Sequence, residues 1–508
     1  MENIQILIVD YGSQYTLVIG RMLRELGIRS VILPPIKADI WLQKNTPKAV
    51  ILSGSNWSVY GENAPKLPTS LDVRGDKYTI LGICYGMQLL AYVGEGKIER
   101  PLTQREYGPS VVKVNTNHPL FKNVSEETEV WASHGDTVLE LPKNFSPIAT
   151  SEGIAGMTSE NNRVMGVQFH PEVVNTKEGK KMFQNFIELS NCVVDWSPMD
   201  LILQIQKEVV GIVGSEKKVI LGVSGGVDST VLAGILAPVL GERLVCIGID
   251  TGGGRFGEIE ELKNNVTSAG VKNLNIIEAS DEFIKNVGTT INSEEKRAKF
   301  REVYKKTFDE QILKHGASFM LQGTLATDII ESGQAGESAM IKTHHNVGLS
   351  FEVEDLHPLR HLFKYEVREL GKMLNLAPSV YERNPFPGPG LFLRIVGTPV
   401  SKENLELVRD ADKTVSDILK SRGLDKEISQ LIVAMLGINS VGVKGDERVY
   451  GHSLAVRAVQ TVDFMTATGY HFPPDVIDEI TSALIKHKDI VRVFFDMTPK
   501  PPATTEFE

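Results

Sequence analysis

The chain has 508 residues, of which 42% are hydrophobic and 23% are charged, a composition typical of a soluble globular protein with about three domains. Its formal net charge of −10 argues against binding of nucleic acid through a basic surface. The three cysteines are too widely spaced for a disulfide framework, and no basic leader or membrane-spanning apolar run is evident, so we expect a cytoplasmic protein without nucleic-acid or membrane partners.

The first third of the sequence alternates between predicted strands and helices. Thr16–Leu26 has the apolar spacing of a helix and is followed by Gly27, a residue type that commonly ends helices. Compact apolar runs that predict buried strands lie at Ile4–Val9, Ser30–Leu33, Ala49–Leu52 and Thr79–Ile83. Buried strands that alternate with helices are typical of a parallel sheet covered on both faces. We therefore predict an α/β domain with a doubly wound parallel sheet over residues 1–192.

A cysteine stands where the fourth of these runs turns into a helix, in the segment Gly82-Ile-Cys-Tyr-Gly-Met-Gln88. A sharp turn there needs small residues on both sides of the side chain that it lifts out of the sheet. The helix N-terminus behind Cys84 favours a thiolate. A lone cysteine is more often an inert core residue, so a catalytic interpretation needs a base elsewhere in the chain.

The segment Gly166-Val-Gln-Phe-His-Pro-Glu172 offers such a base. Pro171 favours extended geometry at His170, so we predict that His170 and Glu172 project to the same side. Glu172 would then fix the tautomer of the imidazole while His170 accepts a proton from Cys84, as in a catalytic triad.

Together the two segments resemble the class I glutamine amidotransferase family, and the resemblance covers roughly residues 1–190. It implies that Cys84 hydrolyses glutamine through a thioester and releases ammonia. It also implies an oxyanion hole formed by Gly54 and the backbone amide of Tyr85. The residues that would bind glutamine or shape its pocket are Gln88, His134 and Asp136.

A second alternating pattern begins after a predicted linker at Val193–Pro198. Its predicted strands and helices lie at Lys218–Val223, Ser229–Leu240, Arg243–Ile249, Glu294–His315 and around residues 363–374. The pattern ends at Asn384–Gly390, where three prolines and two glycines exclude regular structure. We predict a second doubly wound domain over residues 199–384 and a smaller α+β domain over residues 391–508.

The loop after the first strand of the second domain has the composition of a phosphate site. Its glycines let backbone N–H groups approach a phosphate, and the following helix adds a favourable dipole. Asp228 would repel a phosphate unless Mg²⁺ lay between them, so we expect Mg²⁺ bound with ATP. No lysine follows the glycines, unlike a Walker A loop. The segment resembles the PP-loop of ATP pyrophosphatases, which implies that ATP is bound by Ser224, Gly225, Gly226, Val227, Asp228, Ser229 and Thr230.

Later segments narrow the resemblance to the GMP synthetase family, over essentially the whole chain. These segments are Gln322–Ser332, Ile341–Gly348, Asn384–Gly390, Val441–Arg448 and Lys500–Glu508. The resemblance implies that ATP adenylates xanthosine monophosphate (XMP), and that ammonia from glutamine then displaces AMP to give GMP. It implies an XMP site at Arg255, Arg492, Lys500, Thr505 and Glu506, and a synthetase lid at Asp328, Glu331, Lys342, His344 and His345. It also implies a homodimer that forms through the C-terminal domain.

Two segments depart from this family's pattern. Ser53-Gly54-Ser55-Asn56 stands where a Gly-Gly-Pro turn is usual, so we expect a hydrolase that is poorly formed until the synthetase site is occupied. Thr251-Gly-Gly-Gly-Arg255 stands where Gly-Leu-Leu-Arg is common, and we expect a more flexible loop there. Two alternatives remain at this point: a binding or regulatory protein without turnover, or the same enzyme class acting on another acceptor, as in NAD synthesis.

Overall fold

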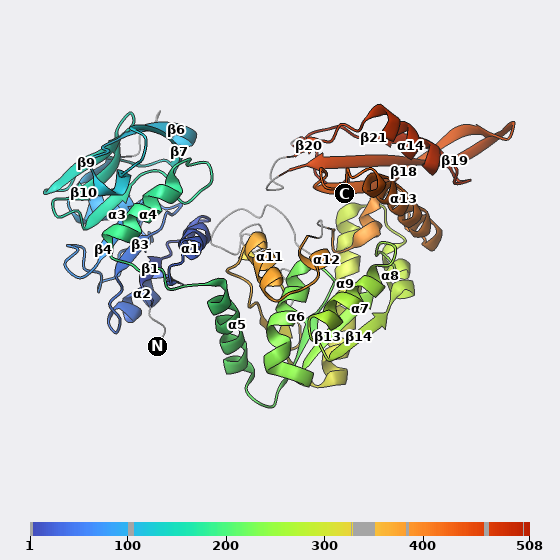
Figure 1. Ribbon diagram of the computed structural model, residues 1–508, viewed down its shortest axis with the longest axis horizontal. Helices are drawn as coiled ribbons and strands as arrows, with labels where there is room; N and C mark the ends of the chain where they lie inside the picture. The colour runs from blue at the N-terminus through green and yellow to red at the C-terminus, as the bar shows by residue number, and fades with distance from the viewer. Residues whose placement is uncertain are drawn as a thin grey trace. The chain divides into compact units, whose positions relative to one another are not determined.

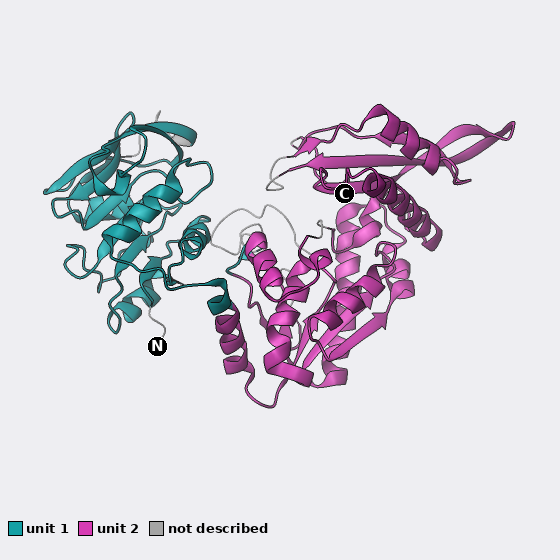
Figure 2. Ribbon diagram, in the orientation of Figure 1, with its two compact units in different colours: residues 1–201, 326–342, 361–363 teal, residues 202–325, 343–360, 364–508 magenta. Residues whose placement is uncertain are grey.

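The computed structural model describes residues 4–99, 106–326, 328, 351–382, 386–461, 467–500 and 502–508. These residues form two compact units, which are coloured separately in Figure 2. Unit 1 comprises residues 1–201, 326–342 and 361–363, and unit 2 comprises residues 202–325, 343–360 and 364–508. None of the helices within the described part is long and apolar enough to cross a membrane.

Unit 1 is built on a nine-stranded sheet in the order β2-β1-β3-β4-β11-β10-β9-β6-β7. Figure 1 labels most of these strands, among them β1, β3 and β4. Its strands are β1 (Ile6–Val9), β2 (Ser30–Leu33), β3 (Ala49–Leu52), β4 (Thr79–Ile83), β6 (Glu106–Val114), β7 (Glu127–His134), β9 (Phe145–Thr150), β10 (Ile154–Ser159) and β11 (Val164–Val167). The run from β2 to β11 is parallel, and the strands from β10 onward pair antiparallel. A separate two-stranded sheet joins β5 (Lys97–Glu99) to β8 (Thr137–Glu140).

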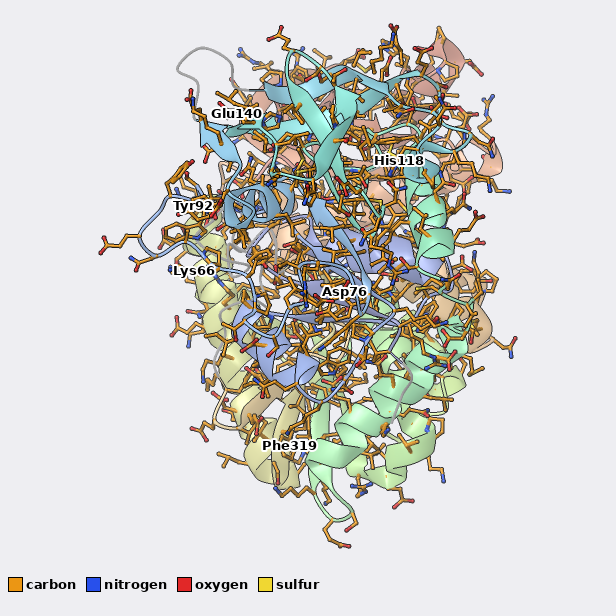
Figure 3. All side chains as sticks on the ribbon, turned by 90° about the vertical axis from the view of Figure 1, so that its left-hand side faces the viewer. Lys66, Asp76, Tyr92, His118, Glu140 and Phe319 are labelled. Carbon is orange, nitrogen blue, oxygen red and sulfur yellow. The ribbon has the colours of Figure 1, made fainter. Side chains whose placement is uncertain are left out.

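Helices cover both faces of the parallel part of this sheet. The helices of unit 1 are α1 (Thr16–Glu25), α2 (Pro35–Leu42), α3 (Tyr85–Val93), η1 (Pro119–Phe121) and α4 (Gly179–Leu189). Alternate residues of β1 enter different hydrophobic clusters, Ile6 and Ile8 one cluster and Leu7 and Val9 the other. This arrangement confirms the doubly wound fold expected from the buried apolar runs. The exposed end of α3 carries Tyr92, which is labelled in Figure 3.

Unit 2 begins with a five-stranded, wholly parallel sheet in the order β14-β13-β12-β15-β16. Its strands β13 and β14 are labelled in Figure 1. Its strands are β12 (Lys218–Gly222), β13 (Leu244–Asp250), β14 (Asn273–Glu278), β15 (Ala317–Leu321) and β16 (Glu354–Leu356). The helices are α5 (Pro198–Val213), most of which belongs to unit 2, α6 (Val227–Leu240), η2 (Gly241–Arg243), α7 (Glu258–Ser268), α8 (Ser280–Val287), α9 (Ser293–His315), α11 (Lys364–Met373) and α12 (Pro378–Tyr381). This sheet is the second doubly wound element that the sequence predicted.

The C-terminal part of unit 2 contains a mixed sheet dominated by one long hairpin. Its elements are η3 (Gly390–Arg394), β17 (Ile395–Val396), α13 (Lys402–Ser421), β18 (Gln430–Lys444), β19 (Glu447–Gln460), β20 (Thr468–Gly469), α14 (Pro474–Leu484) and β21 (Ile490–Phe495). One hydrophobic cluster joins α13, α14 and this sheet to Phe283 of α8 and Phe300 of α9. The predicted division of this unit into residues 199–384 and 391–508 therefore stays a prediction, because the two parts share a core.

Candidate active sites

Cys84 lies on a strained turn between β4 and α3. Its φ of 52° is in the left-handed region, which residues other than glycine seldom adopt. A Cβ at Gly82 would lie 2.6 Å from the carbonyl carbon of Gly86, and a Cβ at Gly86 would lie 2.3 Å from the carbonyl oxygen of Leu52. Both positions therefore require glycine, as expected for a turn that raises the thiol out of the sheet.

The structure brings the three residues of the predicted triad together. His170 Nδ1 and Glu172 Oε1 are 2.8 Å apart, and His170 also hydrogen-bonds the side chain of Cys84. All three side chains are buried. Burial opposes the charged imidazole, but the charge of Glu172 and the hydrogen bonds to Cys84 and Glu172 raise the pKa of His170 well above its usual value. The geometry therefore favours an imidazolium at His170, beside the sulfur of Cys84.

The loop that carries Gly54 lies beside this triad. A Cβ at Gly54 would lie 3.1 Å from Cε1 of His170, so a side chain here would crowd the imidazole. The hydroxyl of Ser55 donates to the carbonyl oxygen of Tyr11 over 2.8 Å, and the backbone N–H of Tyr11 donates to the hydroxyl of Ser53 over 3.0 Å. The two serines thus tie the loop to the segment after β1. Ser55, which stands where glycine is usual, therefore adds a hydrogen bond between the loop and Tyr11. We call the two contacts of Ser53 and Ser55 with Tyr11 the clamp.

The other residues expected in the glutamine pocket lie close to one another. The side-chain amide of Gln88 donates to the carbonyl oxygen of Asp136 over 2.8 Å. His134 is buried at the end of β7, and burial is the main cause that lowers its pKa to about 4, so it is neutral near pH 7. Gln168 was not predicted as a site residue, although it precedes His170 by two positions. Its Nε2 lies 3.8 Å from Sγ of Cys84.

The predicted phosphate loop connects β12 to the N-terminus of α6. Gly225 has a φ of 70°, a conformation that suits glycine. The hydroxyl of Ser229 accepts from the backbone N–H of Ser224 over 3.3 Å, which holds the loop in a curve over the start of the helix. The hydroxyl of Thr230 is buried and lacks a partner among the described residues. The loop is therefore curved over the N-terminus of α6, and its role as a phosphate site stays a prediction.

A lysine that the sequence reading missed lies beside Asp228. Lys364, at the start of α11, places Nζ 2.5 Å from Oδ2 of Asp228. The other oxygen of this carboxylate, Oδ1, is buried and has no partner within the described part of the chain. Lys364 is far from the loop in sequence, so no local motif could have indicated it. The ammonium group of Lys364 and the Oδ1 atom of Asp228 therefore both lie next to the loop.

Three buried cations hold the C-terminal segment, residues 502–508. Arg394 donates to Asp412 over 2.7 Å and lies 3.4 Å from Oε1 of Glu506. Arg457 donates to the carbonyl oxygens of Thr504 and Thr505, each over 3.1 Å. Lys296, which is fully buried, lies 2.6 Å from Oε2 of Glu508. This segment therefore packs into unit 2, although its composition resembles that of a loose tail.

The predicted XMP residues are distributed over several elements. Glu506 accepts from Gln430 at Oε1 over 2.6 Å, and its Oε2 is buried without a partner among the residues described. Arg255 lies 3.3 Å from Asp412 and its guanidinium stands 4.5 Å from the ring centre of Phe386. The others are placed as follows: Thr505 lies beside Arg457, Lys500 pairs with Ala467, and Arg492 is exposed on β21.

The glycines before Arg255 permit close packing where the sequence suggested flexibility. A Cβ at Gly253 would lie 2.5 Å from the ring of Phe392. Arg409 donates to the carbonyl oxygen of Gly254 over 2.9 Å, so α13 fixes the loop. Of the predicted lid, Asp328 is described, whereas Glu331, Lys342, His344 and His345 lie outside the described residues.

The chain is similar to known proteins over its whole length. The glutamine amidotransferase class-I family model matches residues 7–189, and the GMP synthase C terminal domain model matches residues 417–507. The glutamine-hydrolyzing GMP synthase of Bacillus cytotoxicus is 40% identical over 513 residues, with 99% of each chain covered. Those of Mesoplasma florum and Aliarcobacter butzleri are 41% identical over 525 residues and 40% identical over 519 residues, with 100% of each chain covered.

Proposed function

The chain belongs to the family of glutamine-hydrolysing GMP synthases, and we propose that it divides the reaction between a glutaminase site at Cys84 and a synthetase site at the loop Ser224–Thr230. It makes GMP in an ATP-dependent reaction with glutamine as the amido donor. The observation that carries this conclusion is the likeness over the full chain, and the buried contact between Cys84, His170 and Glu172 agrees with it.

In the glutaminase site, the thiolate of Cys84 attacks the side-chain carboxamide of glutamine. The oxyanion is stabilised by the backbone N–H groups at Gly54 and Tyr85, in a site from which water is largely excluded. The imidazolium of His170 gives its proton to the departing ammonia, which leaves a thioester on Cys84. The neutral imidazole then takes a proton from the water that hydrolyses the thioester, and the thiolate is expelled.

In the synthetase site, ATP transfers its adenylyl group to the 2-oxygen of XMP and pyrophosphate leaves. The N–H groups of Gly225 and Gly226, the dipole of α6 and the cation of Lys364 would bind that pyrophosphate. Ammonia then attacks the activated carbon and AMP departs. Activation must come first, because an oxygen held as a carbonyl is a poor leaving group.

The residues at this loop fit Mg²⁺ bound together with ATP. Mg²⁺ commonly takes only one or two carboxylates from a protein and fills its other positions with phosphate and water. Asp228 offers one buried oxygen, Oδ1, that has no partner in the described part. No group of three or more His, Cys, Asp or Glu able to hold a metal is found among the described residues. The ion would neutralise phosphate charge, and Asp228 would position it.

The C-terminal segment of unit 2 would bind XMP. The free oxygen of Glu506 suits a purine N–H or a ribose hydroxyl, and Lys500 suits the phosphate. Residues 502–508 are held in place by contacts of the protein itself, with Arg394, Arg457 and Lys296. A segment ordered in advance loses less conformational entropy on binding than a loose tail would.

The protein is also proposed to work as a homodimer in the cytoplasm. The hairpin of β18 and β19 exposes apolar side chains at its far end, with Val443 75% exposed and Tyr450 67% exposed. A second copy of the chain would cover them, as expected from the resemblance to the family. The three cysteines are free, which agrees with a reducing compartment.

One assay tests the reaction and its alternatives. Purified protein is mixed with ATP, Mg²⁺, XMP and either glutamine or ammonium, and the loss of XMP absorbance is followed. We expect both nitrogen sources to support conversion of XMP. Conversion of nicotinic acid adenine dinucleotide in place of XMP would indicate another acceptor, and glutamine hydrolysis without any conversion would indicate a protein that has lost synthesis.

A further inference from the structure

Gln168 lies two residues before His170, the base of the triad. It follows β11, and the side chains of Gln168, His170 and Glu172 alternate along the chain at positions i, i+2 and i+4. His170 thus has Gln168 two residues before it and Glu172 two residues after it in the sequence. The structure places both His170 and Gln168 against the sulfur of Cys84.

The side-chain amide of Gln168 is oriented by a second glutamine. Its Oε1 accepts from Nε2 of Gln88 over 3.4 Å, while its Nε2 points at Sγ of Cys84 from 3.8 Å. A flip of the Gln168 amide would set two NH₂ groups against each other and turn a carbonyl oxygen toward the sulfur. Because Gln88 is itself held by the carbonyl oxygen of Asp136 over 2.8 Å, the N–H of Gln168 is directed at the sulfur.

The sulfur of Cys84 also contacts the carbonyl oxygen of Ser133, and this contact disfavours a negative charge on the sulfur. The thiol donates to the carbonyl oxygen of Ser133 over 3.7 Å, and that interaction favours the protonated form. An N–H donor favours the thiolate instead. The titratable groups nearby are His170 and Glu172 after β11, His134 at the end of β7 and Asp136 after it. His134 is neutral near pH 7 because burial lowers its pKa to about 4, so it adds no positive charge there.

We propose that Gln168 is a catalytic residue of glutamine hydrolysis, whose amide N–H stabilises the thiolate of Cys84. The stabilisation acts twice, first on the nucleophile that attacks glutamine and again when thioester hydrolysis expels the same thiolate. The contact of 3.8 Å is long, and hydrogen bonds of this kind commonly shorten in the complex with substrate. The inference rests on the proposed glutaminase role of Cys84.

The test compares Gln168→Leu and Gln168→Met with the unaltered protein. Alkylation of Cys84 by iodoacetamide is measured against pH by mass spectrometry of its peptide, which separates it from Cys192 and Cys246. Loss of the donor should move the midpoint of alkylation upward by about one pH unit. The kcat of glutamine hydrolysis should fall about tenfold or more with little change in KM, while synthesis from ammonium stays normal. Gln168→Glu should shift the midpoint further, because it places a negative charge beside the sulfur.

Gln5→Leu is the matched control. Gln5 is also a buried glutamine of unit 1, but its amide binds the carbonyl oxygen of Val193 and the side chain of Asp195. It should lower thermal stability without moving the alkylation midpoint of Cys84. Folded Gln168→Leu or Gln168→Met protein with an unshifted midpoint would overturn the proposal, whether or not kcat falls. A separate outcome distinguishes this inference from the proposed function. If neither the unaltered protein nor any variant converted XMP, the proposed synthesis would be wrong. A shifted alkylation midpoint in the same proteins would still support the role of Gln168.

Discussion

Removal of the Cys84 thiol should separate the two half-reactions. Cys84→Ala is expected to abolish synthesis from glutamine and to leave synthesis from ammonium largely intact, because the thiolate serves only hydrolysis. The measurement is the rate of XMP loss with each nitrogen source in turn. An equal loss of both activities would contradict the assignment of Cys84 to hydrolysis alone.

The pair of His170 and Glu172 predicts a pH dependence of stability. The folded-state pKa of His170 is raised, so its contribution is fully present below the unfolded value of about 6.5 and is lost as pH rises through the folded value. Glu172→Gln removes the charge that raises this pKa. The Tm deficit of the variant should therefore be largest near pH 6 and shrink at alkaline pH, and glutamine hydrolysis should fall about a hundredfold. A deficit that grew with pH would contradict this sign.

Some site residues follow from local sequence and others do not. Cys84, His170 and the loop Ser224–Thr230 were predictable because strand-to-helix turns and short motifs position them locally. Lys364 is 136 residues from Asp228, and only the packing of α11 against α6 brings the two together. Gln168 carried a usable signal, since it shares the alternation of His170 and Glu172. A neutral amide inside a motif does not by itself indicate a catalytic role, because it neither titrates nor acts as a nucleophile.

At the level of elements, the loop Ser53–Asn56 should restrain the glutaminase. The Ser55 hydroxyl binds the Tyr11 carbonyl oxygen, a contact that the usual glycine cannot make. Ser55→Gly combined with Asn56→Pro should raise glutamine hydrolysis measured without XMP, if the clamp holds the oxyanion hole in an unproductive form. Ser55→Ala isolates the contribution of the hydroxyl. An unchanged or lower rate in both variants would show that the clamp does not restrain hydrolysis.

The C-terminal segment should contribute to stability as well as to XMP use. Deletion of residues 502–508 would remove Glu508, the ion-pair partner of the buried Lys296, and two carbonyl partners of the buried Arg457. Loss of one partner of a buried ion pair such as Lys296–Glu508 costs about 3–5 kcal/mol. We therefore expect a lower Tm for the truncated protein. Glu506→Gln is the gentler probe and should raise the KM for XMP about tenfold. Glu479→Gln, at an exposed ion pair with Arg422, is the control, and equal effects of the two would contradict a role for Glu506.

Strands formed by a compact apolar run could be predicted from the sequence, whereas strands with several exposed residues could not. β2, β3 and β4 have the bounds that their compact apolar runs predicted. β7 and β9, by contrast, bury only some of their residues, so they lack such a run. The antiparallel half of the sheet in unit 1 was therefore missed. The shared core of unit 2 was also unpredictable, because Phe283 and Phe300 join it across more than a hundred residues of sequence.

At the scale of the whole molecule, the exposed hairpin should control assembly. If the apolar end of β18 and β19 forms the homodimer contact, Val443→Glu should give monomers in light scattering at concentrations where the unaltered protein is dimeric. Leu313→Glu, an exposed apolar position of α9 that is 70% exposed, is the matched control and should leave assembly unchanged. Dimers that persisted in Val443→Glu would place the contact elsewhere.

The left-handed backbone at Cys84 also has an evolutionary consequence. A non-glycine residue in that conformation is strained by about 1–3 kcal/mol, and glycine would relieve the strain. A mutation of Cys84 to glycine would thus raise the free energy of unfolding, and only selection for the nucleophile would act against it. A lineage that obtained its ammonia from the medium would lose that opposition first at this position. Glycine at residue 84 in a descendant gene would then record relaxed selection for hydrolysis while the synthetase remained under selection.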